Sequence, residues 1–463
     1  MNALYLNTSA MPLAKETIAL TMNTKLGERA YRAAEIVFDN GYEAWWVGGC
    51  VRDMLLGKIP KDIDIATDAK PAELVKLFAK CDDSRADLGA VVISLAGSTF
   101  EVTTFRKETD NSDGREPTGV TFTDRAQDAQ RRDITANAIY WNPISQELWD
   151  PFEGEKDLHE KLIRIIGDPG ERIRHDALRL LRIIRFRATI NGQYHPDTFH
   201  ALHAHAALVK TISGFRCFQE LEKSLLCPHP ETVLEDLWET DVLEHLLPEL
   251  YACKGIGQPS DPHTEGDVWN HILKLVSSFT EDHGKDVRWA ALLHDVGKAE
   301  TFSIEHDRIH FNEHASVGAK IAGGIFLKLQ CEKARKEKIC WLIEHHMMMG
   351  TFREIDEERK AHWYHHPWFI ELLQLFWLDI AGTGRQDFAL YEEIIADYNR
   401  FLDAHPRPAK PLLTGNEVME ILGIQPGEAV GRVLKALHDA QTRKEVTTKK
   451  EARDFLKRVE HLL

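Results

Sequence analysis

Hydrophobic and polar positions divide the chain near residue 150 into two parts with different patterns. Before that point, short apolar or alternating runs such as EAWWVGG, DIDIAT, GAVVISL and TFEVTTF are typical of β-strands. After it, apolar residues recur every three or four positions, which predicts buried helix faces. One such face is predicted from Ile173, Ala177, Leu180, Ile184 and Ala188. The pattern therefore predicts an α+β N-terminal part followed by an all-α remainder.

Helical periodicity continues to the C-terminus in RCFQELEKSLL, WNHILKLVSSF, VRWAALLHDVGK and FIELLQLFWLDIAG. The polar run RKETDNSDGREPTG predicts a loop, and the prolines of AHPRPAKP (404–411) predict a linker before two further helices. The expected segments are a leader or short helix at 1–25, a head at 26–150, a helical neck at 151–250, a helical body at 251–400 and a helical tail at 401–463.

Composition narrows the class of protein. The chain has 463 residues with 57 Lys+Arg against 73 Asp+Glu, and its 43% of hydrophobic residues excludes a disordered chain. A net charge of −16 disfavours nonspecific coating of nucleic acid, yet residues 161–190 carry eight Lys/Arg against three Asp/Glu, which indicates a local anion site. No apolar run reaches the ~18 residues of a membrane span. Scattered cysteines and the lack of a secretory signal predict reduced thiols and a cytoplasmic protein.

Two carboxylates stand at alternate positions in KDIDIAT. Residues two apart on a strand face the same side, so Asp62 and Asp64 are expected to project together. Such a pair is costly without a cation, and Mg²⁺ prefers hard oxygen ligands shared with substrate phosphates. The alternative is an exposed strand end with two solvated acids.

Upstream, Gly48 and Gly49 would let backbone N–H groups approach a phosphate, which Arg52 could also bind.

Two basic clusters follow. Arg131 and Arg132, capped by Asp133, fit either triphosphate binding or a structural ion-pair cluster. Asp176 and Arg179 are expected three apart on one helix, with Arg182 on the same face. That spacing suits a surface ion pair. It also suits a protein template for a nucleobase, because a carboxylate accepts from the amino groups of cytosine and adenine and is repelled by the carbonyls of uracil and guanine.

Histidine and aspartate side chains on successive predicted helices form another candidate metal site in the C-terminal half. The most specific element is the adjacent pair in LLHDVGK, with histidines before and after it. The candidate ligands are His263, His271, His294, Asp295, His314, His345, His346 and Asp379.

Taken in order, these motifs resemble the class II nucleotidyltransferases, which comprise tRNA CCA-adding enzymes and bacterial poly(A) polymerases. The resemblance rests on Gly48–Asp53, Asp62–Asp64, Glu101–Arg106, Arg131–Asp133 and Asp176–Arg179. It implies a head of the polymerase-beta superfamily followed by a helical neck, body and tail. It also implies two Mg²⁺ ions on Asp62 and Asp64, and CTP, ATP and a tRNA 3′ end as substrates, with no membrane and no DNA partner. The implied nucleotide contacts are Gly48, Gly49, Arg52, Arg132, Asp176, Arg179, Arg182 and Arg185.

Departures from the family pattern leave alternatives open. His175 stands where the family's template motif has a glutamate, and Glu101 could be a third carboxylate or a structural one. The stretch after Asp64 lacks the basic pair of the poly(A) polymerases, which favours a tRNA enzyme. Asp113-Gly114-Arg115 indicates a complete flexible loop, which favours an enzyme able to add the terminal A. The leading expectation is a CCA-adding enzyme, and the alternatives are an A-adding enzyme and a poly(A) polymerase.

The C-terminal half resembles the HD-type phosphohydrolases. The resemblance implies His271, His294, Asp295 and Asp379 as ligands of a divalent transition metal or Mg²⁺. In bacterial tRNA nucleotidyltransferases such a domain implies phosphatase or 2′,3′-cyclic phosphodiesterase activity, and the alternative is a helical tRNA-binding body without hydrolysis. An alternative function for the whole protein is that of a metal-dependent phosphohydrolase whose head serves only to bind tRNA.

Overall fold

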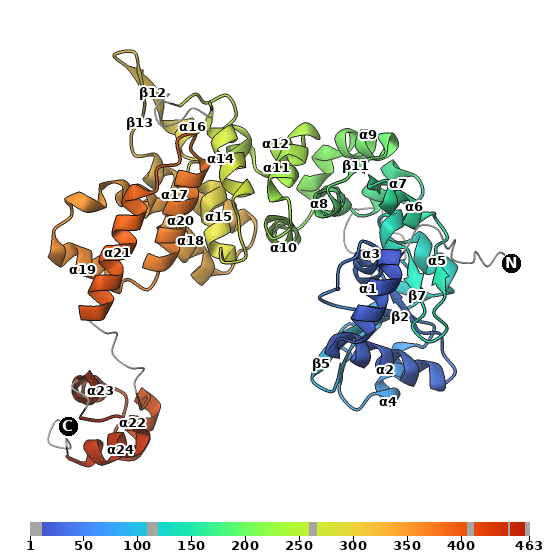
Figure 1. Ribbon diagram of the computed structural model, residues 1–463, viewed down its shortest axis with the longest axis horizontal. Helices are drawn as coiled ribbons and strands as arrows, with labels where there is room; N and C mark the ends of the chain where they lie inside the picture. Colours follow the sequence, from blue (N-terminus) through green and yellow to red (C-terminus); the bar gives the residue numbers. More distant parts are fainter. Residues whose placement is uncertain (1–11, 109–118, 259–265, 405–411, 443–444, 459–463) are drawn as a thin grey trace. The chain divides into compact units, whose positions relative to one another are not determined.

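A computed structural model describes residues 12–108, 119–258, 266–404, 412–442 and 445–458 (Figure 1). The chain forms two compact units. The first comprises residues 1–349 and 370–387, and the second residues 350–369 and 388–463. None of the described helices combines the length and apolar character needed to cross a bilayer.

The head is built on a seven-stranded mixed sheet with strand order β3-β4-β5-β2-β1-β8-β9. Strand β2 pairs with β5 in parallel and with β1 in antiparallel fashion. The strands are β1 (Trp45–Val47), β2 (Asp64–Thr67), β3 (Cys81–Asp82), β4 (Ala90–Leu95), β5 (Ser98–Thr104), β8 (Tyr140–Trp141) and β9 (Leu148–Trp149). All four predicted strand segments are confirmed.

Both faces of this sheet are buried, and successive side chains along a strand point to opposite faces. Trp46 and Ile65 pack into a core with the helices, whereas Trp45, Val47 and Ala66 pack into a second cluster with Tyr140 on the opposite face. The head's helical elements are α1 (Pro12–Met22), α2 (Lys25–Asp39), α3 (Gly49–Leu55), α4 (Pro71–Leu77), η1 (Ala86–Leu88), α5 (Arg125–Gln130) and η2 (Thr135–Asn137). Residues 12–22 are thus the short helix, and it packs on the head's core through Ile18 and Met22.

The predicted polar loop is shorter than expected. Its first residues form β6 (Arg106–Glu108), which pairs with β7 (Val120–Phe122) in an antiparallel ribbon. Asp113-Gly114-Arg115 lies outside the described residues.

The neck is helical, as predicted, but its predicted first long helix is broken. Asp176 has an extended backbone (φ −149°, ψ 102°) and separates two helices. Its carboxylate accepts a hydrogen bond from the Leu178 amide (3.2 Å), a local turn that competes with helix continuation. Ile173 and Leu180 therefore lie on different helices, although both are fully buried. The elements are α6 (Gly154–His159), β10 (Leu162–Ile163), α7 (Pro169–His175), α8 (Arg179–Ile190), β11 (Gln193–Tyr194), α9 (Pro196–Ala204), η3 (Ala206–Thr211), α10 (Gly214–Leu225), α11 (Pro230–Glu239), α12 (Val242–Leu246) and α13 (Pro248–Tyr251).

The rest of the first unit is a helical body with a short hairpin. Its elements are α14 (Val268–Ser277), α15 (Lys285–Leu293), α16 (Lys298–Thr301), β12 (Phe302–Glu305), β13 (Arg308–Phe311), α17 (His314–Lys328), α18 (Lys333–His345) and α20 (Phe369–Gly382). The 3₁₀ helix η4 (His346–Glu354) follows α18 directly.

The second unit contains α19 (Glu357–His365), α21 (Ala389–Ala404), α22 (Gly415–Leu422), α23 (Glu428–Thr442) and α24 (Lys449–Arg458). Val418 of α22, Val433 of α23 and Leu456 of α24 share a small apolar core, which confirms the two helices predicted after residue 411. Of the predicted linker only Ala404 is described, as the last residue of α21, and 405–411 lie outside the described residues.

Candidate nucleotidyltransferase and metal sites

A cavity of about 750 Å³ between the head and the neck collects most of the predicted site residues. Among the described residues, ten cationic and six acidic side chains line it. The cations are Arg52, Arg85, Arg106, Arg131, Arg132, Arg179, Arg182, Arg185, Arg216 and Lys223, and the acids are Asp53, Asp62, Asp64, Asp133, Asp176 and Glu220. Such an excess of cations suits a polyanionic ligand.

Strand register places the predicted carboxylate pair at one side of this cavity. Asp64 is the first residue of β2 and pairs with Val47, the last residue of β1, so it lies beside Gly48. Asp62 precedes the strand and lines the same cavity, on the face of the sheet opposite Ile63 and Ile65. Gly48 has φ +79°, a conformation that L side chains rarely adopt, and a Cβ there would lie 3.6 Å from Arg132 and 3.9 Å from Asp64.

The carboxylates form an electrostatically strained group. Desolvation in the cavity, followed by the charges of Asp62 and Glu101, raises the pKa of Asp64 to about 6, while Arg132 opposes the shift. Glu101 lies on β5 beside β2, and its carboxylate is 3.7 Å from Arg85. A bound cation would relieve this repulsion, and hard carboxylate oxygens suit Mg²⁺.

Arg131 and Arg132 form an ion-pair cluster and also face the cavity, but the acid that holds them is Asp128 and not the predicted Asp133, which pairs with Arg182. Both donate to the buried carboxylate of Asp128, Arg131 from Nε at 2.8 Å and Arg132 from Nη2 at 3.1 Å. The Tyr140 hydroxyl donates to Asp128 (2.6 Å) and accepts from Nε of Arg132 (2.8 Å). The two roles weighed for this cluster are therefore compatible, because the buried carboxylate fixes cations that line the cavity.

A chain of hydrogen bonds joins the head to the neck across the cavity floor. Arg52 donates to Asp53 (2.8 Å) and to Oδ1 of Asn137 (2.9 Å), and Nδ2 of Asn137 donates to Asp133 (3.1 Å). The other oxygen of Asp133 accepts from Nη2 of Arg182 on α8 at 2.6 Å. Arg182 holds the pKa of buried Asp133 far below its usual range, against the effect of desolvation.

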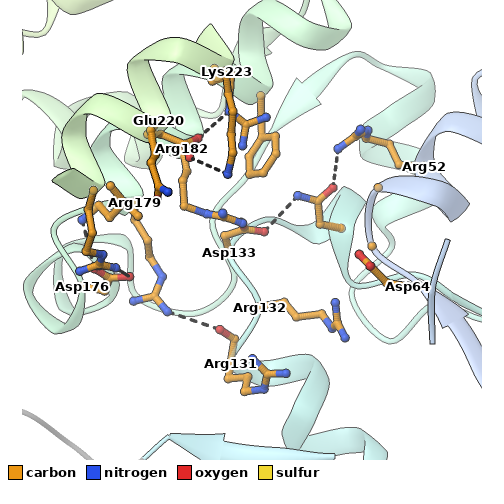
Figure 2. Close-up of a pocket in the computed structure, with 18 of the residues that line it drawn as sticks. Arg52, Asp64, Arg131, Arg132, Asp133, Asp176, Arg179, Arg182, Glu220 and Lys223 are labelled. Carbon is orange, nitrogen blue, oxygen red and sulfur yellow. Dashed lines mark hydrogen bonds and ion pairs between the residues drawn. The ribbon is translucent and has the colours of Figure 1, made fainter. Parts of the chain in front are cut away.

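The predicted base-reading pair lines the same cavity. The expectation that both residues share one helix is wrong, because Asp176 follows α7 in an extended conformation and Arg179 begins α8. Figure 2 shows Asp176 and Arg179 across from Asp64, with Arg132, Asp133 and Arg182 between them. Asp176 is paired with Arg216 of α10 (3.1 and 3.2 Å). Arg179 donates to the carbonyl of Arg172 (2.8 Å).

Sequence reasoning missed the contribution of α10 to this cavity. Arg216 holds Asp176, and the almost fully buried Glu220 accepts from Nε of Arg185 (2.5 Å). These residues are about 40 positions from their partners, so no local spacing pointed to them. His175, which replaces the family's glutamate, is exposed at the end of α7.

A second cluster of predicted ligands converges in the helical body. Nε2 of His271 on α14 lies 3.1 Å from Oδ1 of Asp379 on α20. His294 and Asp295 follow α15, and Nε2 of His294 lies 3.2 Å from Oδ2 of Asp295 and 3.6 Å from Oδ1 of Asp379. Gly382 permits this packing, since a Cβ there would meet Cε1 of His271 at 2.8 Å.

Two further histidines join this cluster. His314 begins α17 and His346 follows α18, and both lie against Oδ1 of Asp295, at 3.5 and 3.9 Å. Of the other candidates, His345 stacks on Trp341 (4.5 Å between ring centroids), and His263 lies outside the described residues. Burial lowers the pKa of His294, but the carboxylates of Asp295 and Asp379 outweigh burial and raise it to about 10.

Comparisons with known proteins identify the family of the chain. The model of the poly(A) polymerase head domain matches residues 44–164, that of the probable RNA- and SrmB-binding site of polymerase A matches 193–253, and that of the HD domain matches 267–398. The CCA-adding enzyme of Streptococcus thermophilus is 31% identical over 89% of this chain and 92% of its own length. The chain belongs to the CCA-adding enzymes. This confirms the family, the fold class and the nucleotidyltransferase activity implied by the motifs.

Other members of the CCA-adding enzymes match over shorter or more divergent stretches. That of Geobacillus thermodenitrificans is 41% identical over 57% of this chain and 61% of its own length. The crystal structure of the Bacillus stearothermophilus CCA-adding enzyme in complex with CTP has a TM-score of 0.59 at 25% identity, covering 95% of this chain and 98% of that one. CCA-adding enzymes with this head and HD domain are metal-dependent nucleotidyltransferases.

The buried Asp128 gives a pH prediction for this member of the CCA-adding enzymes. Its pKa is lowered to about 2, because the charges of Arg132 and Arg131 and the hydrogen bonds outweigh desolvation. An unfolded aspartate titrates near ~3.9, so Asp128 stabilises the fold by about 2–3 kcal/mol above pH ~4 and loses that contribution as pH falls toward 2. Asp128→Asn should lower the free energy of unfolding by that amount at pH 7 and by little near pH 2.

Chemical denaturation across pH 2–7 measures this difference. Asp124→Asn is the matched control, because Asp124 is an exposed N-cap of the same helix and asparagine caps equally well. An equal loss for Asp128→Asn at both pH extremes would contradict the ionic account.

Proposed function

We propose that the cavity between head and neck adds CCA to tRNA 3′ ends from CTP and ATP without a nucleic-acid template, and that the protein works in the cytoplasm. The observation that carries this proposal is a cation-rich cavity lined both by the Asp62–Asp64 pair and by Asp176 and Arg179. Catalytic carboxylates and base-reading groups must meet in one cavity if the protein itself selects the nucleotide. We assign nucleotide transfer to residues 26–250.

In the proposed mechanism Asp62 and Asp64 would hold two Mg²⁺ ions, which would supply activation of the primer 3′-hydroxyl and neutralisation of the charge on the leaving pyrophosphate. Gly48 and Gly49 leave room for the triphosphate beside the carboxylates. Arg52, Arg132, Arg182 and Arg185 contribute positive charge there, and Asp53, Asp128, Asp133 and Glu220 hold these side chains in place.

Base selection is assigned to Asp176 and Arg179. The Asp176 carboxylate accepts from the amino group of cytosine or adenine, and Arg179 donates to ring or carbonyl acceptors. Arg216 orients the carboxylate of Asp176, because it donates to both of its oxygens. His175 stands where the family's template motif has a glutamate, and in this chain Arg216 anchors the neighbouring carboxylate.

A second activity is proposed for the HD site at residues 251–400. His271, His294, Asp295 and Asp379 would hold a divalent transition metal or Mg²⁺, which supplies Lewis-acid activation of a phosphate ester. The supporting observation is that these ligands converge from α14, the end of α15 and α20, with Nε2 of each histidine 3.1–3.9 Å from the carboxylate oxygens of Asp295 and Asp379. The substrate class proposed is a phosphomonoester or 2′,3′-cyclic phosphate at a damaged tRNA end.

Separate substitutions distinguish the two activities. Asp64→Ala should reduce nucleotide addition at least ~10³-fold, since it removes a metal ligand, and leave hydrolysis of a 2′,3′-cyclic phosphate unchanged. His294→Ala should abolish hydrolysis and preserve addition. Both rates are measured on the same full-length variants with a tRNA transcript. Full nucleotide addition by Asp64→Ala would overturn the metal assignment, and loss of both activities in one variant would overturn the division into two sites.

Arg179→Ala tests base selection. We expect discrimination of CTP and ATP against UTP, measured as the ratio of kcat/KM values, to fall about 10-fold or more, because a good bidentate base contact contributes ~1–3 kcal/mol. Arg216→Gln should lower the same ratio through Asp176. Arg174→Ala is the control, since Arg174 is exposed on α7 and paired with Glu171. Unchanged discrimination in Arg179→Ala would contradict the template assignment.

A further inference from the structure

Three arginines of the cavity gather around one aromatic side chain. Phe186 of α8 lines the cavity and is only 5% exposed. The guanidinium carbon of Arg185 lies 4.5 Å from the centre of its ring, that of Arg182 lies 5.3 Å away and that of Arg52 lies 5.8 Å away. All three distances are within the ~6 Å over which the face of an aromatic ring attracts a cation. Arg52 belongs to the head and the other two arginines to the neck, so the ring brings cations of both parts together.

A carboxylate also holds one edge of each of these guanidinium groups. The pairs are Arg52 with Asp53 (2.8 Å), Arg182 with Asp133 (2.6 Å) and Arg185 with Glu220 (2.5 Å). These hydrogen bonds use Nε and Nη2 of Arg182 and Nε of Arg185, and the described part of the chain shows no further hydrogen bond from either side chain. The remaining N–H groups are therefore able to donate to the oxygens of a phosphate, provided that the guanidinium groups stay near one another.

An aromatic ring suits the space between these cations better than other residue types. Neighbouring guanidinium groups repel one another, and the carboxylates fix only one edge of each. The face of an aromatic ring carries partial negative charge, so it attracts the cations without adding a net charge. A further carboxylate would repel a polyanionic triphosphate, and an aliphatic side chain would exclude water without attracting the cations. The residue type at position 186 therefore favours the concentration of positive charge for an anionic ligand.

We propose that Phe186 is a positioning residue for nucleotide binding, whose ring holds Arg52, Arg182 and Arg185 together where they bind the triphosphate of the incoming nucleotide. The inference rests on the function proposed above and adds a residue that itself contacts no phosphate. Phe186 then determines the affinity for the triphosphate, since base selection is assigned to other side chains. The binding of CTP and that of ATP should depend on the ring to the same extent.

Stepwise fluorination of the ring tests this attraction. Incorporation of 4-fluoro-, 3,5-difluoro- or pentafluorophenylalanine at position 186 of the full-length chain withdraws negative charge from the ring face and nearly preserves the shape of the ring. We expect KM for CTP on a tRNA transcript lacking CCA, and KM for ATP on one ending in CC, to rise with each step. The pentafluoro ring should raise both by about 10-fold, which equals ~1.4 kcal/mol. The Kd of CTP without primer should rise in parallel, while kcat and the discrimination against UTP stay at the values of the parent.

Pentafluorophenylalanine at position 100 is the matched control, because Phe100 is 1% exposed in the core of the head and no described cation lies over its ring. It should leave KM unchanged. Equal KM and Kd values across the series at position 186, in a chain that adds nucleotides normally, would overturn the inference and leave the proposed function standing. Loss of discrimination against UTP at unchanged KM would also overturn it.

A parent chain that adds no nucleotide would instead overturn the proposed function itself. Circular dichroism of each variant identifies any loss of affinity that comes from unfolding. If the pentafluoro variant does not fold, the two milder steps of the series decide the matter.

Discussion

The cavity depends on one buried carboxylate. Asp133 accepts hydrogen bonds from Asn137 in the head and from Arg182 in the neck, and through Asn137 it is connected to Arg52 at the start of α3. A buried charge is tolerated only when its partners satisfy it, so the head and the first neck helices are constrained to meet at this position. That constraint places Asp64 and Asp176 on opposite sides of one space.

The carboxylates of this region perform two different tasks. Asp128 and Asp133 have pKa values far below normal because arginines surround them, and they remain charged anchors. The pKa of Asp64 is raised because desolvation and the charges of Asp62 and Glu101 outweigh the opposing charge of Arg132. Opposite shifts of neighbouring groups distinguish the structural acids from the one that gains most from a metal ion.

Sequence patterns predicted four strands of the head's sheet, several of the helices and both clusters of site residues. Those signals are local: a period of two in KDIDIAT and a period of three to four in the helices. The helix break at Asp176 was not predictable from the spacing of apolar residues. It arises because the Asp176 carboxylate accepts a hydrogen bond from the Leu178 amide, and this local turn leaves the apolar spacing unchanged. The contributions of Arg216 and Glu220 to the cavity were not predictable, because they arise from contacts with residues far away in the sequence. His314 and His346 were visible as candidates, but only three-dimensional distances place them beside the other ligands.

The central claim is that side chains in one cavity choose each added nucleotide. Its most direct measurement is the sequence of the product made on a tRNA transcript lacking its last three nucleotides, with all four nucleoside triphosphates present. The account predicts C, C and A in that order, followed by arrest. Addition of A alone to a primer that already ends in CC with no reaction on the shorter primer, a homopolymeric tail, or incorporation of U or G would contradict it.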